Sequence, residues 1–295
     1  PTRELAIQIT KELNRIKQDN VNTLAVYGGQ DMNKERNRLK EGVHILVGTP
    51  GRLLDHMRRE TMDLSNLHTF VLDEADQLLH LGFLPDIENL IDYLPMKKQT
   101  LLFSATIPME IRRLAKRMMD NPKEIFVQDK DITLSNIKQF VYETTDREKQ
   151  NLLCELIQQF HPFLAIIFCR TKRRAKTLNS ALLNRGFLSD ELHGDLSQGK
   201  REKVMERFRT AKIQLLVATD VAARGLDVEG VTHVFNYDIP HDVDSYIHRI
   251  GRTGRAGYEG FAITLVAQKD KNYLHLIEKG INLTLKRKTL PKRNK

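Results

Sequence analysis

The chain has 295 residues, 40% of them hydrophobic and 29% charged, which is the composition of a folded protein of about two domains rather than a disordered one. No apolar run reaches the roughly 18 residues of a membrane span, and two cysteines are too few for a disulfide framework, so a cytoplasmic protein without a membrane partner is expected. The net charge of +9 is uneven, because residues 1–129 carry 18 basic and 19 acidic side chains, whereas residues 130–295 carry 29 and 19. A basic second half suits a polyanion partner, with a solubilising surface as the alternative.

Helical and strand patterns alternate along the first half of the chain. Apolar residues at helical spacing predict helices, and short apolar runs bounded by glycine predict strands. The expected helices are residues 4–17, 50–59, 84–94 and 109–119, and the expected strands are residues 24–27, 44–47, 69–72, 100–103 and 124–127. Strands separated by helices predict βαβ units and a mostly parallel sheet.

The alternation starts afresh after a short polar segment, residues 129–135, which predicts a linker between a first domain of residues 1–128 and a second of residues 136–285. Thr145 and Glu148 have the spacing of a capping box at the start of a helix. Residues 286–295 carry six cations and no acid, and are expected to form a basic tail. The remaining expected strands are residues 138–143, 163–168, 215–218, 233–237 and 262–266, and the remaining helices are residues 172–185, 198–210 and 243–250.

Three carboxylates follow the expected strand at residues 69–72, in the sequence TFVLDEADQLL. The apolar run predicts a buried strand, and the acids would lie at its carboxyl edge, where open α/β sheets bind ligands. The first acid, Asp73, could hold Mg²⁺ through water, and Glu74 could position an attacking water. A solvated acidic turn is the alternative for a bare pair of acids.

The letters D-E-A-D at residues 73–76 and seven further short motifs, in order along both halves, resemble the DEAD-box RNA helicases of superfamily 2, of bacterial type. The resemblance implies an α/β fold of two RecA-like domains, each a mostly parallel sheet flanked by helices, with the first domain incomplete. It also implies ATP and Mg²⁺ as cofactors. The further motifs are PTRELAIQ at residues 1–8, GG at 28–29, TPGR at 49–52, SAT at 104–106, FCRT at 168–171, TDVAARGLD at 219–227 and HRIGRTGR at 248–255.

The resemblance assigns catalytic and ATP-binding roles. Glu74 would position or activate the attacking water, and both Asp73 and Glu74 would hold Mg²⁺ through water. Ser104 and Thr106 are expected to bond the carboxylates of Asp76 and Glu74 and also His248. Arg252 and Arg255 would act as arginine fingers on the γ-phosphate. The residues expected to bind ATP are Gly225, Asp227, Arg252 and Arg255.

A second group of residues is expected to hold single-stranded and duplex RNA. Hydroxyl and guanidinium groups beside glycine suit phosphate contacts, which predicts little base specificity and a preference for RNA through its 2′-hydroxyls. The resemblance also leaves room for a ribosomal or RNA-processing assembly, not further specified. The expected RNA-binding residues are Thr2, Arg3, Gly28, Gly29, Thr49, Gly51, Arg52, Arg170, Thr171, Gly194, Gln198, Arg201 and Thr219.

ATP binding requires a phosphate loop of the form G-x-x-x-x-G-K-[ST], and the one near match, residues 194–201, ends in Arg201 instead of a hydroxyl. The match coincides with the family's RNA-facing HGDLSQ segment and is rejected. The family's phosphate loop and adenine-reading motif precede PTREL, so the chain is expected to be a helicase truncated at its N-terminus and inactive as it stands. A non-catalytic RNA-binding module and a DNA helicase of the same superfamily are the alternatives.

Overall fold

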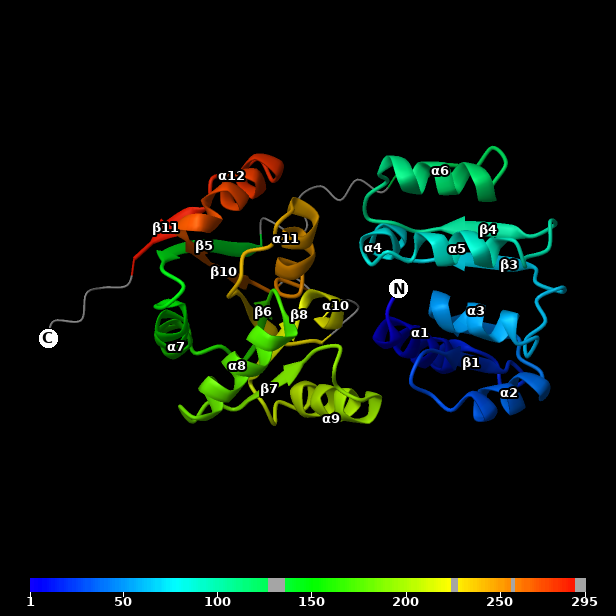
Figure 1. The fold of residues 1–295 in the computed structure, drawn as a ribbon, viewed down its shortest axis with the longest axis horizontal. Helices are drawn as coiled ribbons and strands as arrows, with labels where there is room; N and C mark the ends of the chain where they lie inside the picture. Colours follow the sequence, from blue (N-terminus) through cyan, green and yellow to red (C-terminus); the bar gives the residue numbers. More distant parts are fainter. Residues whose placement is uncertain (127–135, 224–227, 256–257, 290–295) are drawn as a thin grey trace, which may run out of the picture. The chain divides into compact units, whose positions relative to one another are not determined.

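A computed structural model describes residues 1–126, 136–223, 228–255 and 258–289. The chain divides into two compact units, Pro1–Val127 and Gln128–Lys295 (Figure 1). The linker expected at residues 129–135 lies outside the described residues. None of the described helices is long and apolar enough to cross a membrane.

The first unit consists of alternating helices and short parallel strands. Its strands pair as β1 with β2 and β3 with β4, so the described residues form two separate two-stranded sheets instead of the single sheet expected. The elements are α1 (Arg3–Ile16), β1 (Thr23–Val26), α2 (Met32–Lys40), β2 (Ile45–Gly48), α3 (Pro50–Arg58), β3 (Thr69–Leu72), α4 (Ala75–His80), α5 (Leu84–Ile91), β4 (Gln99–Leu102) and α6 (Met109–Met118).

Close packing of α3 explains one glycine of this unit. A Cβ atom on Gly48 would lie within 2.8 Å of the side chains of Leu53 and Val26, so only glycine lets α3 approach β1 and β2 this closely. Pro50 then starts the helix, where its missing N–H costs nothing. Gly48, which directly precedes the TPGR motif, and Pro50 within the motif thus set the position of α3.

Two predictions for the first unit are wrong. Residues 69–72 were expected to be buried, but Val71 is 49% exposed, because α4, α5 and α6 cover only the face of β3 that carries Leu72. Residues 124–126 form no strand, and Ile125 and Phe126 are exposed, since no described strand pairs with them. Apolar character alone therefore did not decide where strands form.

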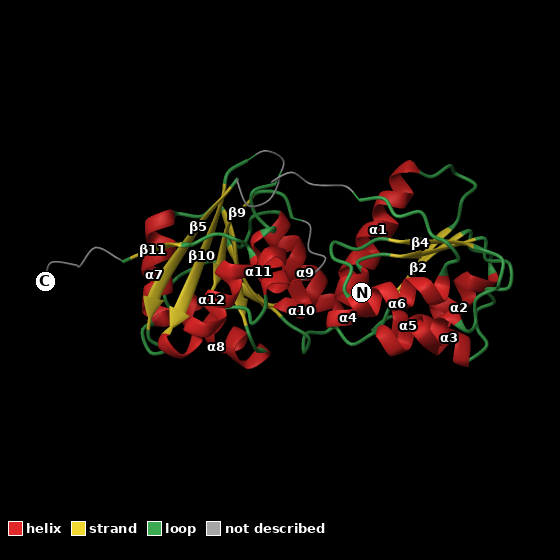
Figure 2. Ribbon diagram, turned by 90° about the horizontal axis from the view of Figure 1, so that it is seen from above, coloured by secondary structure: helices red, strands yellow, loops and turns green. Residues whose placement is uncertain are grey.

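The second unit contains one seven-stranded parallel sheet with the order β11-β5-β10-β9-β6-β8-β7, which Figure 2 shows from its side. Every strand pair in it is parallel. Its elements are β5 (Ile137–Thr144), α7 (Lys149–Phe160), β6 (Leu164–Cys169), α8 (Lys172–Leu183), β7 (Ser189–Leu192), α9 (Gln198–Arg209), β8 (Leu215–Thr219), α10 (Asp220–Ala223), β9 (Val231–Asn236), α11 (Val243–Ile250), β10 (Gly260–Ala267), a 3₁₀ turn (Gln268–Asp270), α12 (Lys271–Gly280) and β11 (Lys286–Lys288).

Helices cover both faces of this sheet. Alternate residues of β6 show the division, because Ala165 and Ile167 pack toward α7 and α8, whereas Leu164 and Ile166 pack toward α9 and α10. Helices α11 and α12 pack on β5 and β10. A strand buried on both faces has an unbroken apolar run, which is why the sequence predicted β6 correctly.

The first residues of the expected basic tail belong to the sheet. Lys286–Lys288 form β11, which pairs with β5, and Arg287 forms an ion pair with Glu278. The Nζ atom of Lys288 lies 3.7 Å from the centroid of the Phe140 ring. A strand of Lys-Arg-Lys has no apolar signal, so the prediction that residues 286–295 form only a tail is wrong at its start. The unpredicted strand β7, with the sequence SDEL, was missed for the same reason.

His233 of β9 is a buried histidine inside an aromatic cluster. Its ring stacks on Phe261 at a centroid distance of 4.8 Å and meets Phe160 edge-on at 5.6 Å. Nδ1 lies 2.8 Å from the Thr232 hydroxyl, whereas Nε2 is buried and has no hydrogen-bond partner among the described residues. Burial lowers the pKa of His233 to about 4.

We predict that His233 makes the second unit sensitive to acid. A histidine pKa that is lower in the folded than in the unfolded state means that stability falls as the pH drops from 6.5 to about 4, by at most about 3 kcal/mol. His233→Phe should flatten this part of the pH profile and keep the stability at neutral pH. Urea unfolding followed by circular dichroism at several pH values measures it, and an unchanged profile would contradict the assignment.

Candidate functional site

The acidic turn after β3 has an unusual backbone. Glu74 is in the left-handed region, with φ 49° and ψ 51°, at the N-cap of α4. Its N–H donates to Oδ1 of Asp73 at 2.9 Å. Such a conformation costs a non-glycine residue about 1 kcal/mol or more, and strain of this kind gathers at functional sites. The turn places the three acids at the carboxyl end of β3.

The serine and threonine of the SAT motif hold Asp76. The Asp76 N–H donates to Oγ of Ser104 at 3.0 Å, and Oγ1 of Thr106 donates to Oδ2 of Asp76 at 3.4 Å. The Ser104 hydroxyl donates in turn to the Thr106 carbonyl at 2.6 Å. Because Asp76 is only 1% exposed, these bonds join the ends of β3 and β4 in one rigid unit. The expected contact of the motif with Asp76 is present.

Four residues expected to contact RNA meet at one end of the first unit. The Thr2 hydroxyl caps α1 by accepting the Leu5 N–H at 3.2 Å. The guanidinium of Arg3 lies against Gly28, since a Cβ atom there would come within 3.0 Å of Nη2. Gly29 has a φ of 93°, a backbone conformation that residues other than glycine adopt only with strain. Segments 2–3 and 28–29 are therefore brought together.

Arg52 has a structural task that the motif did not indicate. Its Nε donates to Oε2 of the buried Glu35 at 2.7 Å, and its Nη2 donates to the Gln30 carbonyl at 2.8 Å. The same Oε2 lies 2.9 Å from Nε2 of His56. Arg52 thus supports the loop that carries Gly28 and Gly29, and its side chain is only 12% exposed. The sequence analysis missed Glu35 and His56, because nothing marks a buried glutamate within the charged run NKERNRLK.

The other two residues of the TPGR motif lie at the start of α3. Thr49 is the N-cap residue, although its hydroxyl makes no capping bond, and Gly51 lies exposed in the first turn. Thr49 also donates its N–H to the Val26 carbonyl at 3.1 Å, which ties the helix start to the end of β1. The loops after β1 and β2 are therefore neighbours.

In the second unit, the expected RNA-binding residues follow three adjacent strands. Arg170 and Thr171 come after β6, Gly194 comes after β7, and Thr219 ends β8. These strands are neighbours in the order β6-β8-β7 and are parallel, so their carboxyl ends share one edge of the sheet. The sheet topology gathers residues that are up to 49 positions apart.

The near match to a phosphate loop lies at the same edge and behaves as a turn followed by a helix. Gln198 starts α9 and bonds Glu202 through its side chain at 3.0 Å. Arg201, 7% exposed, donates from Nη1 to the His193 carbonyl at 3.2 Å. Asp195 bonds Lys172 at 2.6 Å. A carboxylate in the turn and a buried arginine in place of the hydroxyl agree with the rejection of this segment.

The turn after α11 presents the two arginines expected to act on ATP. Arg252 donates from Nε to the His248 carbonyl at 3.2 Å, and Arg255 donates from Nε to the Gly251 carbonyl at 2.8 Å. Gly254 has a φ of 70°, and a Cβ atom there would lie 2.7 Å from Ile137, so the turn requires glycine. Gly225 and Asp227 lie outside the described residues.

Arg249 was missed by the sequence analysis, although it stands inside the HRIGRTGR motif. It is 3% exposed and forms a bidentate ion pair with Asp220, at 2.5 Å from Nε to Oδ1 and 2.7 Å from Nη2 to Oδ2. Nη1 donates to the Asp238 carbonyl at 2.6 Å. It thereby locks α11 to α10. Arg249 lies on the same buried side of α11 as Tyr246 and Ile250. The helical spacing of these three residues in the sequence could have indicated that Arg249 is buried.

Comparison with known proteins decides the family. The family model of the DEAD/DEAH box helicases matches residues 1–114, and that of the helicase conserved C-terminal domain matches residues 148–257. A solved structure of S. cerevisiae Dbp5 L327V, bound to RNA and ADP BeF3, is 33% identical with a TM-score of 0.88, and the match covers 98% of this chain and 75% of that one. The chain belongs to the DEAD-box helicase family. The DEAD-box ATP-dependent RNA helicase CshA of Bacillus licheniformis is 51% identical over 99% of this chain, which spans 60% of that relative.

The magnesium ion that the resemblance implies can be compared with the donors at the acidic turn. Among the described residues no group of three or more His, Cys, Asp or Glu side chains could hold a metal ion directly. Magnesium keeps several waters and is usually held by one or two carboxylates together with substrate phosphates. Asp73 and Glu74 therefore fit an ion bound through water beside a nucleotide, and do not form a metal cage.

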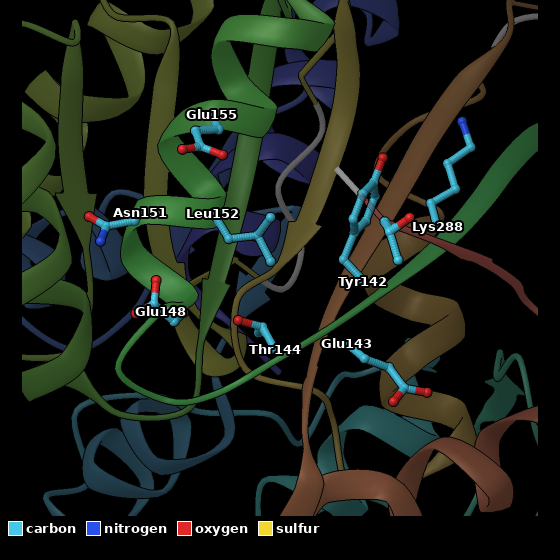
Figure 3. Close-up of a pocket in the computed structure, with 9 residues that line it drawn as sticks. Tyr142, Glu143, Thr144, Glu148, Asn151, Leu152, Glu155 and Lys288 are labelled. Atoms are coloured by element: carbon cyan, nitrogen blue, oxygen red, sulfur yellow. The ribbon is translucent and has the colours of Figure 1, made fainter. Parts of the chain in front are cut away.

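A hollow of about 240 Å³ lies in the second unit, between α7 and the edge formed by β5 and β11 (Figure 3). Three glutamates line it, Glu143, Glu148 and Glu155, with Lys288 at its side. Carboxylates repel phosphate groups, so we assign neither nucleotide nor RNA to this hollow. The candidate site of the second unit stays at the carboxyl ends of β6, β8 and β7.

We predict that Arg249→Met destabilises the second unit by about 1–3 kcal/mol, because it removes an almost fully buried guanidinium and leaves the Asp238 carbonyl and the Asp220 carboxylate, which is 28% exposed, without their donor. Arg207→Met is a matched control, since Arg207 pairs with Asp190 at 2.6 Å in a half-exposed position and should cost less than about 1 kcal/mol. The chain has no tryptophan, so circular dichroism in urea is the measurement. Equal losses for the two variants would contradict the structural role.

Proposed function

We propose that the protein is an ATP-dependent RNA helicase that separates short RNA duplexes by local distortion of one strand. The observation that supports this most strongly is the strained Glu74 turn, with Asp76 held by Ser104 and Thr106 at the ends of adjacent strands. A catalytic carboxylate must be held rigidly to act on a water molecule, and a strained turn on a sheet edge supplies that rigidity.

The ATP reaction is assigned to groups from both halves. Glu74 orients the attacking water and accepts its proton, and Asp73 holds Mg²⁺ through water. A magnesium ion, when bound, neutralises charge on the phosphates. Arg252 and Arg255 stabilise the negative charge that develops on the transferred phosphoryl group, while Asp227 and Gly225 contact the nucleotide. Guanidinium groups suit this task, since they stay charged and bond two oxygens at once.

RNA is assigned to the loops at the strand ends. In the first unit Arg3, Gly28, Gly29, Thr49 and Gly51 hold the sugar-phosphate backbone, with Arg52 as the support of the glycine loop. In the second unit Arg170, Thr171, Gly194 and Thr219 do the same. The similar Dbp5 structure is bound to RNA, and a solved structure of Mss116p, 29% identical to this chain, is bound to ssRNA. Backbone contacts without base reading fit a helicase that acts on many sequences.

The domain limits, a cytoplasmic setting and a ribosomal or RNA-processing assembly stay predictions. A DNA helicase is the second candidate by family, and competition between RNA and DNA strands of equal sequence distinguishes the two. The curated relatives that the chain matches are longer, as the chain spans 60% of CshA from B. licheniformis. The 295 residues contain no G-x-x-x-x-G-K-[ST] loop, so catalytic tests use a fusion that supplies a P-loop.

We predict that Glu74→Gln in such a fusion keeps ATP binding and lowers turnover by about 100-fold or more, because the carboxylate acts on water and not on nucleotide affinity. Glu60→Gln is the control, since Glu60 is an exposed glutamate that also has a positive φ, of 52°. Steady-state ATPase with a separate nucleotide-binding measurement tests both. Turnover within a few-fold of the wild type would remove the catalytic role of Glu74.

The basic end of the chain allows a test of RNA binding that leaves β11 intact. Replacing Lys292, Arg293 and Lys295 by glutamine removes three cations, and the slope of log affinity against log salt for single-stranded RNA should fall by up to about 2. Replacing Lys97, Lys98 and Lys116 of the first unit is the control for net charge. If the salt slope of RNA affinity is the same with and without these three cations, the basic end serves only as a solubilising extension.

A further inference from the structure

Lys149 is the most deeply buried cation of the second unit among the residues that the structure describes. It is the first residue of α7 and is only 1% exposed, although lysine is almost never fully buried unless it is paired. Its Nζ donates to Oδ2 of Asp270 at 3.3 Å and lies 3.9 Å from Oδ1 of Asp238. Asp146 is 3.7 Å away. Lys149 belongs to none of the motifs that carry the proposed function.

The two buried carboxylates that Lys149 joins each hold an arginine on their other side. Asp270 lies 3.6 Å from Nη2 of Arg170. Asp238 accepts the backbone N–H of Arg170 at 3.0 Å and the Nε–H of Arg174 at 2.8 Å. The network therefore runs from Arg170 through Asp270, Lys149 and Asp238 to Arg174. The two arginines are 39% and 38% exposed and flank the Thr171 cap of α8.

The charge balance explains why a lysine is needed at the centre. Asp238 and Asp270 are 4% and 3% exposed, and two buried carboxylates on either side of one position repel each other and lose solvation. A cation between them offsets this repulsion. Interactions between carboxylates and guanidinium groups are charge-assisted, so the placement of Arg170 and Arg174 depends on two carboxylates that Lys149 holds together.

We propose that Lys149 is a positioning residue of the RNA site, which orients Arg170 and Arg174 through Asp270 and Asp238. Lys149 does not touch RNA, because its side chain is almost completely buried. Arg174 then becomes a further phosphate-contacting residue beside Arg170, at the carboxyl end of β6. The inference rests on the proposed RNA site, and the measurements below distinguish a failure of the inference from a failure of that site.

The test compares three variants of the whole chain. Lys149→Met removes the central cation with little change of shape. Lys149→Met with Asp270→Asn also removes the carboxylate that this change leaves uncompensated. Lys271→Met is the matched control, because Lys271 forms an exposed ion pair with Glu143 at 2.9 Å and has the same charge. The measurements are hydrogen exchange of the Arg170 amide by NMR, affinity for a short oligouridine, and urea unfolding.

We expect Lys149→Met to lower both the protection of the Arg170 amide and the RNA affinity by about ten-fold or more, since a charge-assisted bond is loosened. The double variant should regain stability but not affinity. Lys271→Met should match the wild type in all three measurements. If the double variant regains affinity together with stability, or if Lys149→Met binds RNA normally, the positioning role is overturned.

Hydrogen exchange of the Arg170 amide is measured without RNA, so its result does not depend on the proposed RNA site. If the wild-type chain fails to bind oligouridine, the proposed RNA site is overturned, and the protection of the Arg170 amide alone decides whether Lys149 orients this loop. Unchanged protection in Lys149→Met would overturn the inference even if RNA binds.

Discussion

The parallel arrangement of the strands is the constraint on which the candidate site depends. Parallel neighbours end at the same edge of a sheet, so whatever follows each strand is collected there. In the second unit, the residues after β6, β8 and β7 lie at one edge of the seven-stranded sheet. In the first unit, the acids after β3 and the SAT motif after β4 lie at one edge of the β3–β4 pair. The strand order alone therefore makes neighbours of residues that are far apart in the chain.

Buried charges then hold the loops at that edge. Arg52 with Glu35 supports the glycine loop, Arg249 with Asp220 joins α11 to α10, and Lys149 joins Asp238 to Asp270. In each of them at least one partner is almost fully buried, whereas pairs such as Arg15 with Glu12 lie in solvent. A buried pair adds little net stability over an apolar substitute, but its loss is costly and its geometry is strict. Such pairs therefore suit the precise support of functional loops better than stabilisation in general.

Sequence reasoning was most reliable for strands that helices cover on both faces, and it missed the polar strands at the edges of the second sheet. The strands at the centre of the second sheet were predicted because both faces are covered by helices and the side chains are uniformly apolar. It missed β7 and β11, whose residues are mostly polar, because an edge strand is decided by its hydrogen-bonding neighbour. It also assigned a strand to residues 124–127, where Ile125 and Phe126 are exposed.

By itself the sequence determined the alternation of helices and strands, the acidic turn and the order of the motifs, since these depend on local spacing and on residue type. Tertiary structure alone decided which motif residues are available to a ligand. Arg52 and Arg201 donate hydrogen bonds within the protein. Arg249, Glu35 and Lys149 have structural roles that the motifs did not indicate. The physical reason is that the burial of a charged side chain and the identity of its partner depend on residues that are distant in the chain. The residues next to it in the sequence do not show which distant residues those are.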